Sequence, residues 1–147
     1  TNALDSEPRA MSCREAAIWH LHAGLGAFMQ ELSRFYKVIP PVSTPAALAA
    51  AMAQRQQVSP EAEILQQLSD LPDSWLSQLN QLYRATLLPV ELPDLATEAE
   101  SPARIGIAVV NTSVDSPLSQ SDLATLDAIH RALTQAIRDF RAELVEF

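Results

Sequence analysis

At 147 residues the chain is long enough for one domain with a substantial core, and 48% of its residues are hydrophobic, as in globular proteins. A formal charge of −8, with only ten Lys and Arg, argues against nucleic acid and against an anionic membrane surface as partners. Cys13 is the only cysteine, which excludes an internal disulfide and favours a reducing compartment, so we expect a cytoplasmic protein.

The composition also favours helix over strand. The chain holds only three glycines, while alanine, leucine and glutamine are abundant. No apolar run approaches the roughly 20 residues that span a bilayer, so we expect no membrane partner. We therefore expect residues 1–147 to form a single all-α domain.

The first predicted helix is long. Residues 1–11 are short and polar, and we interpret them as a lead-in or as the tail of a preceding helix. Ser12 and Glu15 match the capping box, in which side chain and backbone satisfy each other's free groups. The proline-free stretch that follows predicts a helix of about seven turns, ending near Lys37.

Three shorter helices are predicted next. Thr44-Pro45 and Ser59-Pro60 are start signals, because proline at the first helical position loses no hydrogen bond. A third segment has apolar residues recurring at three and four positions after Asp73. The predicted helices cover residues 45–57, 60–69 and 73–87.

Residues 88–118 are predicted to be a long connection, because they contain four prolines and an acidic patch. Within it, IGIAVV (105–110) is rich in β-branched residues. A lone strand cannot satisfy its backbone, so we predict a small β pair with LPVEL within 88–110, or pairing with another chain.

The last predicted helix, from about Ser119 to Glu146, has apolar residues at alternating steps of three and four, as a bundle seam requires. His130 interrupts this seam. We interpret it as a neutral core histidine that is hydrogen-bonded to a neighbour, or as a polar residue that sets the partner at a pH-sensitive interface. Together the segments predict a roughly antiparallel bundle of about five helices, of which the first and last are long.

The segment WHLHAGLG, residues 19–26, places two histidines and two glycines on the first helix. Positions two apart on a helix point about 200° apart, so His20 and His22 cannot bind one metal ion together. His22 falls at the border of the core stripe, beside Trp19 and Gly26, and these three predict a second packing surface. His20 falls on the opposite face, one turn before Gly24.

His20 and Gly24 have the spacing seen in histidine phosphotransfer domains, helical bundles in which a glycine lets a partner approach an exposed histidine. Those domains usually carry Lys or Arg three residues after the histidine, where this chain has Ala23. The missing cation removes a stabiliser of the phosphoryl charge, which weakens this alternative.

Two further patterns in the sequence resemble a nuclease site and a metal site. Arg14 and His20 loosely fit the pattern of all-helical HEPN nucleases, but the chain lacks a basic surface that would hold RNA. Asp127 and His130 form one Asp-x-x-His pair, whereas di-iron bundles need two such pairs and further carboxylates. We therefore expect no metal and no cofactor.

The stretches REAAIWHLHAGLGAFMQELSRFYKV and PDSWLSQLNQLYRATL, with the closing FRAELVEF, resemble a family of small gammaproteobacterial proteins from Pseudomonas and its relatives. That family has no known activity, so the resemblance implies no functional residues. Its members begin with a further helix, which implies that TNALDSEPRA is the tail of that helix.

From these observations we expect a non-enzymatic cytoplasmic interaction protein that forms a homodimer. The candidate packing or interface residues are Trp19, His22, Gly26 and His130. The alternative is a phosphotransfer-like signalling module that uses His20 beside Gly24.

Overall fold

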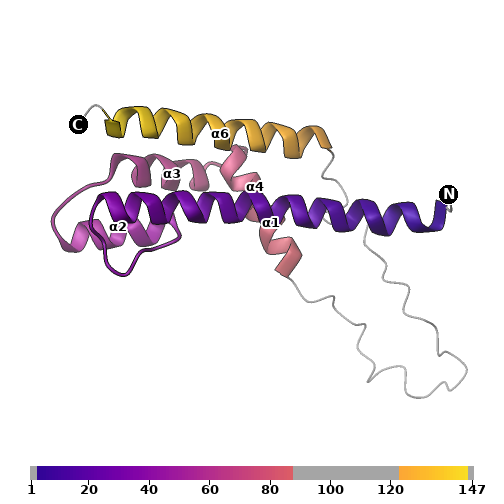
Figure 1. The fold of residues 1–147 in the computed structure, drawn as a ribbon, viewed down its shortest axis with the longest axis horizontal. Helices are drawn as coiled ribbons and strands as arrows, with labels where there is room; N and C mark the ends of the chain where they lie inside the picture. Colours follow the sequence, from indigo (N-terminus) through magenta and orange to yellow (C-terminus); the bar gives the residue numbers. More distant parts are fainter. Residues whose placement is uncertain (1–2, 88–122, 146–147) are drawn as a thin grey trace, which may run out of the picture.

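The computed structural model describes residues 3–87 and 123–145, which form five helices (Figure 1). This described part contains no strand, so the prediction of an all-α fold is confirmed. The predicted β pair within 88–110 and the connection 88–118 lie outside the described residues. The helices are α1 (Ala3–Phe35), α2 (Pro45–Gln54), α3 (Pro60–Asp70), α4 (Trp75–Leu87) and α6 (Leu123–Val145).

The start of α1 differs from the prediction. The helix begins at Ala3, so Ser12 and Glu15 lie inside it and do not form an N-terminal capping box. Residues 3–11 are the first turns of α1, not a lead-in or the tail of a separate helix. Pro8 lies in the second turn of α1, where its missing N–H removes one backbone hydrogen bond of the helix.

The starts of α2 and α3 are as predicted. The side-chain oxygen of Thr44 accepts a hydrogen bond from the backbone N–H of Ala47 at 3.2 Å, and Ser59 accepts one from Ala62 at the same distance. Proline occupies the first position of both helices. Each cap thus satisfies one of the free N–H groups at a helix start.

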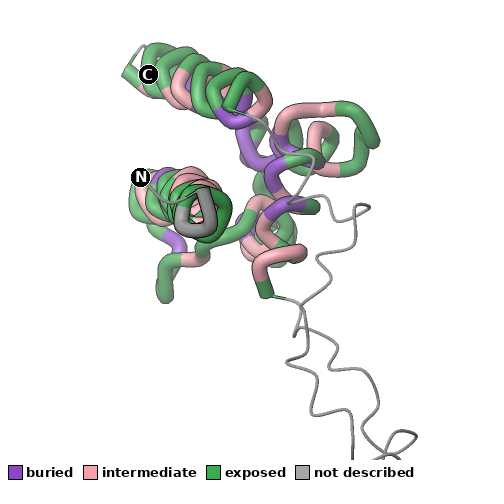
Figure 2. Tube along the Cα trace, turned by 90° about the vertical axis from the view of Figure 1, so that its right-hand side faces the viewer, coloured by how far each residue is buried: buried purple, intermediate pink, exposed green. Residues whose placement is uncertain are grey.

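The core is organised along one apolar stripe of α1. The helices α2, α4 and α6 pack against α1, and α3 packs against α2 and α4. In the view along the long helices, the buried positions lie where the helices face one another (Figure 2). The buried residues of the stripe are Ile18, Leu25, Phe28, Met29 and Leu32.

The two long helices run in the same direction (Figure 1). Phe28 of α1 stacks with Phe140 of α6, their ring centroids 6.0 Å apart, and three residues further on Glu31 binds Arg141 at 2.6 Å. The partner positions therefore advance together along both helices. The expected antiparallel arrangement is wrong for this pair.

The helix α4 crosses α1 in the opposite sense. Trp19 donates a hydrogen bond from its indole N–H to the hydroxyl of Thr86 at 2.8 Å, while His22, further along α1, stacks on the earlier Tyr83. The chain thus reverses between α1 and α4 and again before α6. Because α4 runs opposite to α1, and α6 runs opposite to α4, α6 is parallel to α1.

The seam of α6 is rotated relative to the prediction. Ile129 is fully buried, while His130 and Leu123, which were expected on the seam, are exposed. The apolar repeat can run from Leu126 to Leu133 in two ways. It can pass through Ile129, in steps of three and four, or through His130, in steps of four and three. The apolar side chain takes the core position, so the interpretation of His130 as a core histidine is wrong.

A buried polar group ties the end of α1 to the start of α3. The carboxylate of Glu61, only 4% exposed, accepts hydrogen bonds from the Tyr36 hydroxyl at 2.6 Å and from the Ser59 hydroxyl at 2.9 Å. Burial, together with the bond to Glu61, raises the pKa of Tyr36 to about 12. The tyrosine is therefore a proton donor to a carboxylate that would otherwise be under-bonded inside the protein.

We predict that Tyr36→Phe lowers the free energy of unfolding by roughly 1–2 kcal/mol, because Glu61 then loses one of its two donors while staying buried. Urea denaturation at neutral pH measures the change. Tyr83→Phe is the matched control, because the Tyr83 hydroxyl makes no hydrogen bond to any described residue, and we expect little change from it. An equal loss in both variants would contradict the prediction.

The same bond has an alkaline signature. The pKa of Tyr36 is higher in the folded chain than the ordinary value of 10.0, so the folded state keeps this proton longer than the unfolded state does. The stabilisation is complete below pH 10 and is lost as the pH rises toward 12. Wild type should therefore lose stability more steeply than Tyr36→Phe over this interval.

Candidate functional site

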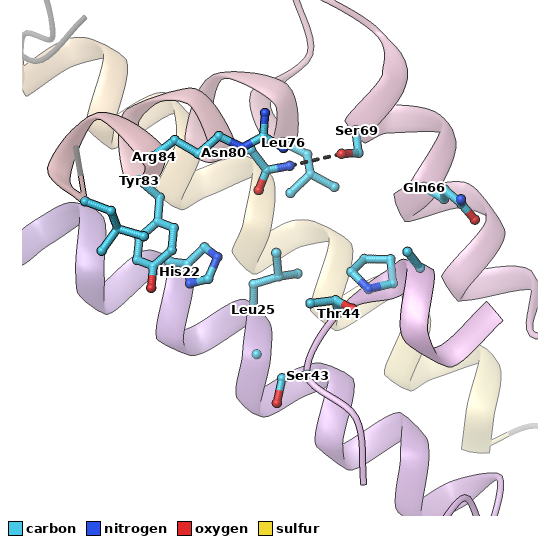
Figure 3. A pocket seen from close by; sticks show the side chains of 14 residues that line it. His22, Leu25, Ser43, Thr44, Gln66, Ser69, Leu76, Asn80, Tyr83 and Arg84 are labelled. Carbon is cyan, nitrogen blue, oxygen red and sulfur yellow. Dashed lines mark hydrogen bonds between the residues drawn. The ribbon is translucent and has the colours of Figure 1, made fainter. Parts of the chain in front are cut away.

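Two hollows flank α1, one on the side of α4 and one on the side of α6. We call the first the His22 cleft; it has a volume of about 390 Å³ and lies among α1, the start of α2, α3 and α4 (Figure 3). We call the second the α1–α6 groove; it has a volume of about 560 Å³. Of the candidate residues from the sequence, His22 and Gly26 line the first hollow, and His20, Gly24 and His130 line the second; Trp19 lines neither.

One wall of the His22 cleft is an aromatic stack. The rings of His22 and Tyr83 lie nearly parallel, at 3°, with centroids 3.5 Å apart. Both side chains are half-buried, and burial lowers the pKa of His22 below its ordinary 6.5. The imidazole is therefore neutral at pH 7 and presents a flat, weakly polar surface.

The remaining walls combine an apolar floor with polar edges. Leu25 and Leu76 line the cleft with only 4% and 1% of their surface exposed. The Asn80 side chain of α4 donates a hydrogen bond to the Ser69 hydroxyl of α3 at 3.0 Å, which holds these two helices together at the rim (Figure 3). Arg84 lies one turn beyond Asn80 and is exposed.

Trp19 and Gly26, predicted to share a packing surface with His22, do lie on this side of α1. The Trp19 indole is hydrogen-bonded to Thr86 and remains 51% exposed. A methyl group at Gly26 would meet Ser43 at ordinary contact distances, 3.8 Å from its carbonyl oxygen. The neighbour of Gly26 is thus the segment before α2, and not a closely packed helix as expected.

The α1–α6 groove contains the other candidates. His20 and Gly24 of α1 line it together with His130 of α6. Gly24 is exposed as expected, and a methyl group placed there would meet the Leu133 side chain of α6 at 4.0 Å, an ordinary contact distance. Both histidines are exposed. Most of the other lining is apolar, and it includes Ala17, Leu21, Leu123, Leu126, Leu133 and Ile137.

Of the residues of the other hypotheses, Asp127 and His130 both line the α1–α6 groove beside His20. Arg14 does not line the groove that contains His20. Within residues 3–87 and 123–145, no group of three or more His, Cys, Asp or Glu side chains could hold a metal ion. None of the helices in this part of the chain is both long enough and apolar enough to cross a bilayer.

The fold and the two hollows define an all-helical protein with one mixed cleft and one apolar groove beside its longest helix. The chain belongs to the family of unknown function DUF6586, whose family model matches residues 2–147. Membership of a family without known function agrees with the resemblance seen in the sequence; the gammaproteobacterial origin stays a prediction. No curated protein and no solved structure matches the chain.

Sequence reasoning missed the contribution of α4 to the His22 cleft. It identified the apolar positions of this helix but not Asn80, Tyr83 and Arg84, which line the cleft. A signal was present in the spacing, because steps of three and four place these three on one strip of the helix. The sequence could not show that this strip faces His22.

We predict that the His22 imidazole titrates below pH 6.5 and that Tyr83→Ala, which removes the stacked ring, moves its pKa back toward 6.5. A pH titration followed by NMR of the imidazole measures both. Because the folded pKa is the lower one, the stability that neutral His22 contributes is present above pH 6.5 and is lost as the pH falls. Tyr36→Phe, away from the cleft, should leave the titration unchanged; a similar shift in that variant would contradict the assignment to Tyr83.

Proposed function

We propose that this protein is a non-enzymatic interaction protein that pairs with a second copy of itself through the α1–α6 groove and the exposed beginning of α1. The proposal depends on one observation, the lack of burial of residues 6–17. None of these twelve positions on α1 is buried, although the same helix is buried repeatedly from Ile18 onward. Figure 1 shows this part of α1 extending past the start of α6.

A helix segment with no buried side chain gains little stability from packing, and it depends on its continuity with the packed part of α1. Isolated helices shorter than about 12–15 residues are marginal even with favourable sequences, because most helical stability comes from burying one face. The beginning of α1 carries half-buried Ala10 and Met11, whose apolar surface a partner helix would cover. Packing against a second molecule would therefore supply burial that the described part of the chain does not provide for this segment.

Charge favours a second copy as the occupant. The protein as a whole carries −8, so most pairs of surfaces on two copies repel each other. Residues 6–17 contain two glutamates and two arginines, which cancel. Two copies can bring this segment together without net repulsion.

The α1–α6 groove is continuous with the exposed surface of the beginning of α1. Leu123 is 81% exposed and lines the groove where the beginning of α1 leaves the body of the protein. A helix laid along that part of α1 therefore reaches the apolar lining between α1 and α6. The pairing buries Leu123 together with the apolar lining of the groove to which it belongs.

Two chemical observations support the non-enzymatic role and the cytoplasmic location that we propose. Neither His20 nor His22 is hydrogen-bonded to a hydroxyl or thiol of the described residues, which supports a role other than nucleophilic catalysis. The one cysteine, Cys13, is a free and exposed thiol, which supports a reducing compartment such as the cytoplasm.

We predict that wild type is a dimer in light-scattering measurements and that Leu123→Gln weakens the dimer about tenfold or more, as the loss of a buried leucine at an interface implies. The matched control is Val145→Gln. Val145 is 85% exposed, at the opposite end of the same helix and outside the groove. We expect its substitution to leave the dissociation constant unchanged.

The outcomes separate the occupants of the surface. A wild type that stays monomeric at every concentration overturns self-association, and the covering of residues 6–17 would then fall to another protein or to another segment of this chain. A dimer that both substitutions weaken equally would place the interface elsewhere.

The phosphotransfer alternative has two observations in its favour, the exposure of His20 and the exposure of Gly24. Two features oppose it. Ala23 offers no cation to a phosphoryl group, and α6 lies beside Gly24, where a partner's active site would have to approach. We therefore prefer the interaction protein.

We predict that phosphoramidate, a small phosphoryl donor, leaves His20 unmodified under conditions that phosphorylate phosphotransfer domains. Phosphorus NMR and intact mass at neutral pH detect a phosphohistidine. His20→Gln provides the baseline for labelling of the other two histidines. Labelling that disappears in this variant would favour the signalling alternative.

A further inference from the structure

We propose that the His22 cleft binds a small organic anion: a molecule with a flat or aliphatic apolar body and one acidic group, such as a carboxylate or sulfonate. This inference is independent of the pairing through the α1–α6 groove, because the two hollows lie on different sides of α1. It rests on the shape of the cleft, on its floor and on the charge of its rim.

The volume suits a small molecule. At about 390 Å³, the cleft falls within the range of roughly 300–1,000 Å³ typical of ligand sites. Its walls come from four helices and the segment before α2, and the lining side chains surround one central space (Figure 3). Such a site can enclose a ligand from several directions, which a shallow groove between two helices cannot do.

The floor suits an apolar body. Leu25 and Leu76, both nearly fully buried, provide aliphatic surface. Beside them the His22–Tyr83 stack offers a rigid planar wall that is already formed without a ligand. A ligand that packs on this wall orders few side chains on binding, which favours affinity.

The rim favours an anion. None of the described residues that line the cleft is acidic, although acidic residues outnumber basic ones 18 to 10 in the whole chain. Arg84 stands at the rim and makes no ion pair with any residue in the described part of the chain. An exposed guanidinium that has no ion pair within the described residues can form a charge-assisted bond with a ligand.

The start of α2, which forms the wall opposite α4, adds to the positive potential that favours an anion in the cleft. The first turn of α2 lines the cleft with Pro45 and Ala46 and contains no acidic residue. The positive end of the α2 dipole is therefore not neutralised by a side chain of its own helix. Arg84 and the start of α2 approach the cleft from two different elements, so an acidic group between them is attracted from both sides.

The test compares two fluorescent probes that differ by one acidic group. The first is 8-anilinonaphthalene-1-sulfonate, which has an aromatic body and a sulfonate. The second is N-phenyl-1-naphthylamine, which has the same body without the sulfonate. We expect the sulfonate probe to bind one-to-one and more tightly than the neutral probe, by about tenfold if it forms one charge-assisted bond.

The variants locate the binding. Arg84→Gln should remove most of the advantage of the sulfonate probe and leave binding of the neutral probe nearly unchanged. Arg138→Gln is the matched control, because Arg138 is also an exposed helical arginine without an ion pair to a described residue, on α6 and away from the cleft. The amide signals of Ala46 and Asn80 should shift on titration with the sulfonate probe.

Equal affinity for the two probes would overturn the proposal, as would equal effects of Arg84→Gln and Arg138→Gln. Signal shifts confined to Leu123, Leu133 and Ile137 would also overturn it, because the probe would then occupy the α1–α6 groove. Circular dichroism of both variants checks that the substitutions, each at an exposed position, leave the helices intact.

Discussion

The burial of one apolar stripe along α1 is the constraint on which the rest of the structure depends. No single neighbour covers it: α2, α4 and α6 each take a part. Because α4 crosses α1 and α6 runs parallel to it, the cover is incomplete on both sides, and a hollow remains at each. The beginning of α1 continues beyond the cover altogether. Both hollows and the exposed helix segment thus follow from how a long helix is shared among shorter neighbours.

The two sides of α1 differ in chemistry. On the side of α4, polar contacts hold the walls in place: Trp19 to Thr86, Asn80 to Ser69 and the His22–Tyr83 stack. On the side of α6, the lining is mainly aliphatic, and the one described ion pair between the helices, Glu31 with Arg141, is exposed and contributes little to stability. The preformed His22 cleft, with its apolar floor and polar edges, suits a small ligand. The aliphatic α1–α6 groove, beside the exposed beginning of α1, suits another helix.

The prediction of the fold succeeded where short-range physics decides. The helix starts at Thr44 and Ser59 depend on a side chain and a proline within three residues, and both were predicted. The core stripe of α1 follows a local spacing, because the buried residues Ile18, Leu25, Met29 and Leu32 recur at steps of seven, four and three. The predictions failed where two local solutions were equally good. Ser12 could have begun a helix, but the turns before it are helical too, and His130 could have joined the seam of α6, but Ile129 fills the same step.

By itself the sequence determined the helical class, the short helices and the apolar faces, because these depend on propensity, capping and periodicity within one segment. Only the tertiary structure decided that Tyr83 lies on His22, that Gly24 faces Leu133 and that Tyr36 donates to Glu61. These contacts join positions that are 61, 109 and 25 residues apart in the chain, respectively. Which surfaces meet over such separations depends on how the whole set of apolar faces can be buried at once, and no local pattern carries that information.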